Sequence, residues 1–99
     1  MPTFELQFSQ NAKEDLKSFK KTEQTSILDA IPEQLASEPL TETRNRKPLR
    51  ANDLAAWELR IDRYRVFYDV DSENSIVFIR AVGWKDHNIL WIRGKEYTL

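Results

Sequence analysis

The chain has 99 residues, of which 40% are hydrophobic and 11% aromatic, and this composition predicts one folded domain spanning residues 1–99. It has no cysteine and one histidine, which excludes disulfides, thiol nucleophiles and metal sites built on either residue, so no cofactor or metal is expected. No apolar run is long enough to cross a membrane and no secretion signal opens the chain, so we expect a cytoplasmic protein without a membrane partner.

The formal charge of −1 conceals an asymmetry along the chain. Four lysines against eight carboxylates give residues 1–43 a charge of −4, whereas the remainder carries +3 and holds every arginine. This division suits an anionic ligand on the second half, although a solvated basic loop explains it equally well. A general nucleic-acid binder would usually be more basic.

Residues 3–8 alternate between polar and apolar side chains and predict an opening strand. A first helix follows, capped by Ser9 or Asn11, with its apolar side chains on one face. Apolar residues between positions 27 and 35 predict a second helix, which Pro32 should kink or restart. Two such helices form an αα-hairpin whose apolar faces need a sheet to pack against.

The connection from Pro39, which should end the second helix, to Ala56 is rich in Thr, Asn, Arg and Lys. We interpret it as a surface loop. Loops on a rigid scaffold often carry binding residues, and this one holds most of the uncommitted positive charge, including Lys47 and Arg50.

The stretch over residues 57–70, WELRIDRYRVFYDV, predicts a β-hairpin. Apolar and charged side chains alternate on both sides of Asp62-Arg63, which fits a tight turn between two strands. Antiparallel pairing through this turn places Arg60 opposite Arg65, so two guanidinium groups lie side by side.

A third strand over residues 76–83 follows a turn at 72–75. Continued pairing places Arg80 opposite Phe67, on the same face as the two arginines of the hairpin. Like charges in such positions repel, so either neighbouring carboxylates or an external anion must neutralise them. A structural ion-pair cluster and an anion site are equally good interpretations.

The tail WKDHNILWIRGKEYTL is compatible with a short helix through Trp91 or with a strand pair that turns at Arg93-Gly94, and we favour the helix. The element order predicts an α+β fold: an N-terminal strand, an αα-hairpin and three antiparallel strands in one mainly antiparallel sheet, with the helices on one face. The other face should stay open to bases and phosphates or to an amphipathic peptide. Its expected residues are Arg60, Arg65, Phe67, Phe78 and Arg80.

The second half of the chain contains ELR, followed by YRVFYDV, a short turn, and IVFIRAVG with a basic residue just beyond. This pattern resembles the C-terminal half of the RelE/ParE superfamily of bacterial toxins. The specific motif lies between Trp57 and Gly83, and the element order agrees over the whole chain. The resemblance implies the toxin of a toxin–antitoxin system, with a cognate antitoxin as partner, and is compatible with a toxin–antitoxin hetero-oligomer.

The RelE-like branch is favoured, and its members cut mRNA on the ribosome. The resemblance therefore implies a metal-independent endoribonuclease, an mRNA interferase that inhibits translation. Whether the chain is an enzyme stays open, because the alternative keeps the fold without the nuclease: a ParE-like inhibitor of DNA gyrase, or an inactive member that retains only antitoxin binding.

Metal-free RNA cleavage needs a base for the 2′-hydroxyl proton, cations for the charge on phosphorus and an acid for the leaving oxygen. The resemblance places Arg65, the arginine of YRV, at the phosphate, and assigns phosphate stabilisation to Lys85. Glu58 lies near positions where some RelE-like enzymes carry lysines. It is a candidate carboxylate base, or else a salt-bridge partner of Arg60.

The chain also differs from active members of the superfamily at the proton donor. Active members have a C-terminal Tyr or His near the position of Trp91, whose indole cannot exchange a proton at neutral pH. His87 and Tyr97 are the available substitutes, and His87 has the suitable titration range. The remaining assignments are nucleic-acid binding by Arg60, Arg80, Lys47, Arg50 and Trp91, and antitoxin binding by Phe67, Phe78 and Trp84.

Overall fold

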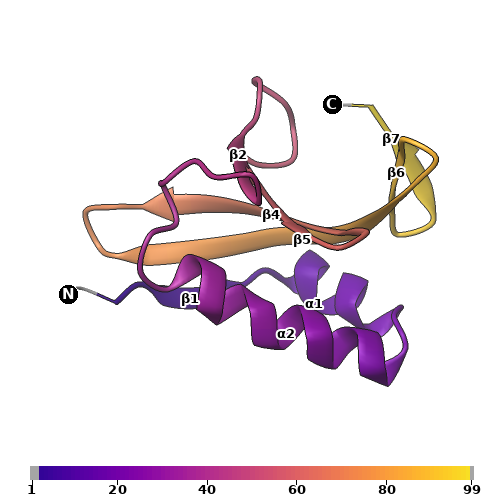
Figure 1. The fold of residues 1–99 in the computed structure, drawn as a ribbon, viewed down its shortest axis with the longest axis horizontal. Coiled ribbons are helices and arrows are strands. Elements are labelled where there is room, and N and C mark those ends of the chain that lie inside the picture. The colour runs from indigo at the N-terminus through magenta and orange to yellow at the C-terminus, as the bar shows by residue number, and fades with distance from the viewer. Residues whose placement is uncertain (1–2, 99) are drawn as a thin grey trace.

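The structure is a computed structural model that describes residues 3–98, and it places two helices against one face of a twisted seven-stranded sheet (Figure 1). The elements are β1 (Glu5–Phe8), α1 (Gln10–Lys17), α2 (Lys21–Leu35), β2 (Arg46–Pro48), β3 (Trp57–Ile61), β4 (Tyr64–Asp71), β5 (Ile76–Asp86), β6 (Ile89–Ile92) and β7 (Lys95–Tyr97). The sheet order is β2-β3-β4-β5-β6-β7, all antiparallel, and β1 runs parallel to β5. The predicted α+β class is confirmed.

Both helices have local causes in the sequence. Ser9, rather than Asn11, caps α1, because its Oγ accepts the Ala12 amide at 3.0 Å. Pro32 does not restart α2, which continues to Leu35 and ends well before Pro39. Its ring lies on the exposed side of the helix, where water can satisfy the carbonyl that it leaves without a donor. Neither helix of residues 3–98 has the length and hydropathy needed to span a bilayer.

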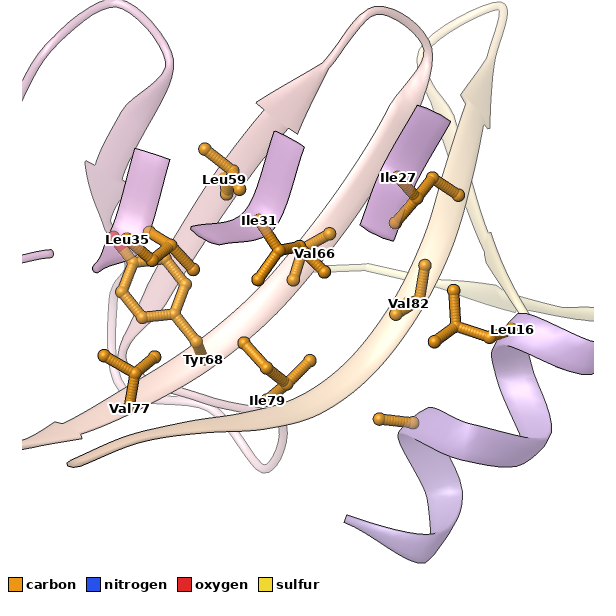
Figure 2. Packing of buried hydrophobic residues seen from close by; sticks show 11 residues of the cluster. Leu16, Ile27, Ile31, Leu35, Leu59, Val66, Tyr68, Val77, Ile79 and Val82 are labelled. Carbon is orange, nitrogen blue, oxygen red and sulfur yellow. The ribbon is translucent and has the colours of Figure 1, made fainter. Parts of the chain in front are cut away.

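The main core lies between the helices and the sheet (Figure 2). A fully buried Val, Leu or Ile side chain contributes about 1.5–3 kcal/mol to stability. The buried residues are Ala12, Leu16, Ile27, Ile31, Leu35, Leu59, Val66, Tyr68, Val77, Ile79 and Val82. Trp57, Ile61 and Tyr64 pack around this cluster, so the predicted helix-facing side of the hairpin is confirmed.

The predicted hairpin register is also confirmed, with Arg60 paired to Arg65 and Ile61 paired to Tyr64. Asp62 adopts a φ of 53°, which a tight turn demands and which aspartate tolerates better than most residues. The third strand departs from the prediction. Its register with β4 shifts beside Phe67, so that Ala81, not Arg80, lies opposite this ring.

The sheet face opposite the helices is covered where we expected it to be open. Phe67 is 0% exposed and lies in a second cluster with Ala55, Ala81, Leu90 and Ile92. Two parts of the chain supply this cover: the predicted surface loop, which contains β2 and folds back onto the sheet, and the C-terminal strands. The prediction of an exposed Phe67 was therefore wrong.

The tail forms β6 and β7, so the favoured helix was wrong and the strand pair turning at Arg93-Gly94 is observed. Positive φ angles occur at both tight turns of the tail, over His87-Asn88 and over Arg93-Gly94. Gly83 allows the bend that leads into it, because a Cβ there would collide with the Trp91 carbonyl and approach the Ile92 side chain. We call residues 84–98 the C-terminal arm. In Figure 1 it rises from the sheet on the side away from the helices.

Candidate functional site

A cleft of about 400 Å³ lies on the sheet face opposite the helices, between β2, β3 and the C-terminal arm. We call it the sheet cleft. Its charged and phenolic lining residues are Lys47, Glu58, Arg60, Lys85, Glu96 and Tyr97. The structure thus brings together four sequence-predicted site residues that lie up to 38 positions apart in the chain.

Glu58 lies at the buried edge of the sheet cleft, with only 5% of its surface exposed. Arg60 Nε is 3.6 Å from its carboxylate, which is longer than a charge-assisted hydrogen bond. Lys47 of β2 lies opposite Glu58 of β3 in the strand register and lines the same cleft. The buried Glu58 carboxylate therefore lies near the cations Lys47 and Arg60, an arrangement that suits either a structural ion pair or a general base.

Arg65 lies beside this group rather than in the lining of the cleft. Its guanidinium donates to the carbonyls of Asp62 at 2.7 Å and Tyr64 at 2.9 Å, which holds it against its own turn. Burial lowers the pKa of Arg65, the charge of Glu58 opposes this effect and the charge of Arg60 adds to it. Among residues 3–98, the buried Nε atoms of Arg60 and Arg65 have no hydrogen-bond partner.

Lys85 reaches the cleft from the start of the arm. Its backbone amide donates to the Arg63 carbonyl at 2.8 Å, which ties the arm to the turn between β3 and β4. Its ammonium forms no ion pair within residues 3–98. Lys85 therefore supplies a cation on the wall of the cleft that faces Glu58 and Arg60.

The two candidate proton donors, His87 and Tyr97, lie in different surroundings. The His87 side chain is 91% exposed in the turn between β5 and β6, with Nδ1 2.9 Å from the Asp86 carboxylate, and it does not line the sheet cleft. Tyr97 does line it, from β7. The sequence analysis preferred His87 for its titration range. The turn residues Arg93-Gly94, which allow the strand pair that carries Tyr97, were the signal in favour of Tyr97.

The other predicted nucleic-acid residues lie outside the cleft. Arg80 donates to Asp69 at 2.8 Å and lies 5.1 Å from the centre of the Phe78 ring. Together with Arg50 it lines a separate, more open hollow of about 570 Å³ beside the loop over residues 49–56. Of the basic residues assigned to nucleic acid, only Lys47 and Arg60 lie in the sheet cleft.

The continuous antitoxin surface expected from Phe67, Phe78, Trp84 and Trp91 is not formed. Trp84 pairs with Tyr64, whose hydroxyl donates to Glu23 of α2, so Trp84 lies on the helix side of the sheet. Trp91 stacks on Trp84 with ring centres 5.9 Å apart. Phe78 lies on the other side, because its neighbours Val77 and Ile79 point into the main core. The two tryptophans and Phe78 therefore occupy opposite faces.

No group of three or more His, Asp or Glu side chains arranged to hold a metal ion occurs within residues 3–98. The chemistry available in the sheet cleft is that of one buried carboxylate, several cations and one phenol. This combination can transfer protons and stabilise negative charge on a bound phosphate.

Comparison with known proteins identifies the family of the chain. The family model of the ParE toxin of the type II toxin–antitoxin system parDE matches residues 6–88. No curated protein sequence matches the chain. Among solved structures, the toxin–antitoxin complex RelBE2 from Mycobacterium tuberculosis has a chain with 26% identity and a TM-score of 0.71, over 84% of this chain and 99% of that one.

The archaeal RelE–RelB complex from Pyrococcus horikoshii shares the fold, with a TM-score of 0.68 and 18% identity over 88% of this chain and 99% of that one. The family match spans most of the chain, including the hairpin and the strand that carried the resemblance in the sequence. The chain therefore belongs to the ParE toxin family of type II toxin–antitoxin systems, within the RelE/ParE superfamily.

Proposed function

We propose that the protein is a single-domain toxin that cuts mRNA on the ribosome without a metal ion, and that a cognate antitoxin neutralises it in a toxin–antitoxin complex. The observation that carries this proposal is the sheet cleft, where the buried Glu58 carboxylate lies among Lys47, Arg60 and Lys85. The Arg60 side chain is 39% exposed and its Nε lies 3.6 Å from the Glu58 carboxylate, too far for a charge-assisted hydrogen bond, which supports an external anion over a self-contained ion-pair cluster.

The proposed reaction assigns one task to each group. Glu58 accepts the proton of the 2′-hydroxyl, and the oxygen formed attacks the adjacent phosphorus. The bond from phosphorus to the 5′-oxygen breaks, and Tyr97 supplies the proton that this leaving oxygen takes up. Arg60, Arg65 and Lys85 stabilise the charge that develops on the phosphate oxygens, which is where fixed cations act most strongly.

Two features support Tyr97 over His87 as the acid. Tyr97 lines the cleft that holds Glu58, whereas His87 points into solvent beside Asp86. A proton donor must come within hydrogen-bond reach of the atom that it serves, so geometry takes precedence over the more convenient titration range of histidine.

A second candidate keeps the fold and omits the nuclease. The matching family model is that of ParE toxins, which favours a ParE-like inhibitor of DNA gyrase, and the ion pair between Arg60 and Glu58 gives Glu58 a structural role. An inactive member that retains only antitoxin binding would fit the same observations.

The deciding experiment compares the purified parent protein with Glu58→Gln in two assays. One follows cleavage of a defined mRNA on programmed ribosomes, and the other follows supercoiling by DNA gyrase. We expect the parent to cut mRNA and to leave supercoiling unchanged, and Glu58→Gln to bind ribosomes without cutting. Inhibition of gyrase by both proteins, with intact mRNA, would assign the protein to the second candidate.

A further inference from the structure

Asp15 is a fully buried carboxylate that joins three parts of the fold. It lies on α1, its Oδ2 accepts the backbone amide of Val82 in β5 at 3.0 Å, and its two oxygens accept Arg93 Nη1 at 2.8 and 3.0 Å. Arg93 stands in the turn between β6 and β7 with a φ of 50°. One side chain therefore connects the helical layer to β5 just before the arm and to the turn between β6 and β7 within the arm.

The arm also contacts the rest of the molecule elsewhere: the centre of the Trp84 ring lies 5.7 Å from the Arg63 guanidinium, which pairs with Glu23 of α2. The arm packs its apolar residues Leu90 and Ile92 on the opposite face, in the second cluster with Phe67. It is joined to the sheet through the bend at Gly83, where the missing Cβ leaves room for the Trp91 backbone. The Lys85 amide donates to the Arg63 carbonyl near the base of the arm, and Arg93 adds a charged side-chain contact between the arm and α1.

We propose that Asp15 and Arg93 form a clasp that sets the position of the C-terminal arm and, through it, the geometry of the sheet cleft. The arm carries Lys85 and Tyr97, whereas Glu58 and Arg60 belong to β3. Asp15 and Arg93 are thus positioning residues: they reach neither the cleft nor a substrate, but they place one wall of the cleft against the other. The consequence for RNA cleavage rests on the proposed function.

The electrostatics agree with a role in position rather than in stability. Burial raises the pKa of the Asp15 carboxyl, and this effect exceeds the opposing effects of the Val82 amide and of Arg93. Keeping the Asp15 carboxylate charged in its buried position therefore costs free energy. Buried ion pairs of this type often add little net stability, but removing only one partner leaves the other uncompensated.

The clasp predicts different results for its two halves. Asp15→Asn keeps an oxygen for the Val82 amide and frees Arg93, whose side chain is 34% exposed and can turn to water. Arg93→Gln leaves a buried carboxylate without its cation and should lower the melting temperature more. In both variants the arm amides should exchange hydrogen at least about tenfold faster, while amides at the centre of the sheet stay protected.

A spectroscopic readout tests the arm directly. The stacked indoles of Trp84 and Trp91 both belong to the arm, so their mutual near-ultraviolet circular dichroism reports its conformation. A Trp57→Phe background removes the third tryptophan of the chain. The signal should weaken in Asp15→Asn and in Arg93→Gln and persist in the control Glu14→Gln, which removes the adjacent exposed carboxylate of α1.

The double variant and the activity complete the test. Because the two residues act as one unit, Asp15→Asn/Arg93→Gln should change arm exchange no more than the stronger single variant. On programmed ribosomes, Asp15→Asn should lower kcat roughly 10- to 100-fold with KM little changed. Unchanged arm exchange and dichroism, or faster exchange spread evenly over the domain, would overturn the clasp. A parent that cuts no mRNA would reject the proposed function alone, since exchange and dichroism need no RNA.

Discussion

Arg60 and Arg65 lie directly opposite each other on neighbouring antiparallel strands, and the Nε atoms of both are buried without a partner among residues 3–98. Like charges in facing positions destabilise a sheet, and Glu58 alone compensates at 3.6 Å from one of them. A phosphate bound in the sheet cleft would place a second anion beside these two guanidinium groups, and this pair therefore provides a direct test of anion binding.

Arg65→Ala should abolish growth inhibition without unfolding the protein, because its side chain lies outside the main core. The loss of a charge-assisted contact to phosphate should cost about 1.5–3 kcal/mol of binding. Toxicity and thermal unfolding are measured together, with Arg80→Ala as a control outside the cleft. Leu59→Ala should instead lose about 2–5 kcal/mol of stability, since Leu59 is fully buried. Full toxicity in a folded Arg65→Ala variant would refute the phosphate role.

Tyr97→Phe should keep the fold and slow mRNA cleavage by roughly 10²- to 10⁴-fold, the usual contribution of one proton donor. His87→Gln should cut as fast as the parent, because His87 is exposed and does not line the sheet cleft. Initial cleavage rates on programmed ribosomes measure both. If the two results were exchanged, the acid would be His87.

Acid should weaken the fold in a way that depends on Glu23. The hydrogen bond from the Tyr64 hydroxyl at 2.6 Å, followed by that from the Lys20 amide, lowers the pKa of Glu23 from an ordinary 4.5 to about 2. A folded pKa below the unfolded value stabilises the protein above the unfolded pKa, so this contribution disappears as the pH falls from 4.5 toward 2.

Urea unfolding at several pH values across this window checks the sign of the effect. The parent should lose more stability on acidification than Glu23→Gln, whose amide oxygen can still accept the Tyr64 hydroxyl but cannot titrate. Parallel pH profiles for the two proteins would show that Glu23 is not the group responsible.

Phe78→Asp should weaken antitoxin binding strongly and leave the fold intact. An antitoxin that neutralises the proposed nuclease must reach the face that carries the sheet cleft, and Phe78 lies on this face with the Arg80 guanidinium against its ring. An acidic amphipathic segment would bury the ring and pair with the cation. Trp84→Asp, on the helix side, serves as the matched control in titrations with purified antitoxin. Greater loss in the Trp84 variant would locate the partner on the helices.

The hairpin was predictable because its causes are local. The alternation of residues 57–70 and the tight turn at Asp62 determine which side chains share a face and which pair across the ladder. The same alternation correctly assigned Leu59, Val66 and Tyr68 to the helix-facing side. Arg60 and Glu58 could be placed together for the same reason.

The covering of the opposite face was not predictable in this way. Alternation assigns Phe67 to that face, but it does not reveal that a loop preceding the hairpin and an arm following β5 pack on it. The register shift beside Phe67 also depends on contacts between strands rather than on the residues of either strand alone. Tyr97 joins the sheet cleft only through these long-range contacts, and the sequence pattern alone did not select it.

The pairing of β5 with both ends of the chain has a consequence for synthesis. Its first four residues pair with β1, and its last three pair with β6. During translation, β1 (residues 5–8) cannot pair until residues 76–79 have been synthesised. The sheet is therefore completed late and depends on contacts between distant segments. A chain released before β5 is complete lacks part of the strand that pairs with β1 and with β6. We therefore expect copies terminated before β5 is complete to lack the folded sheet and to show no toxicity.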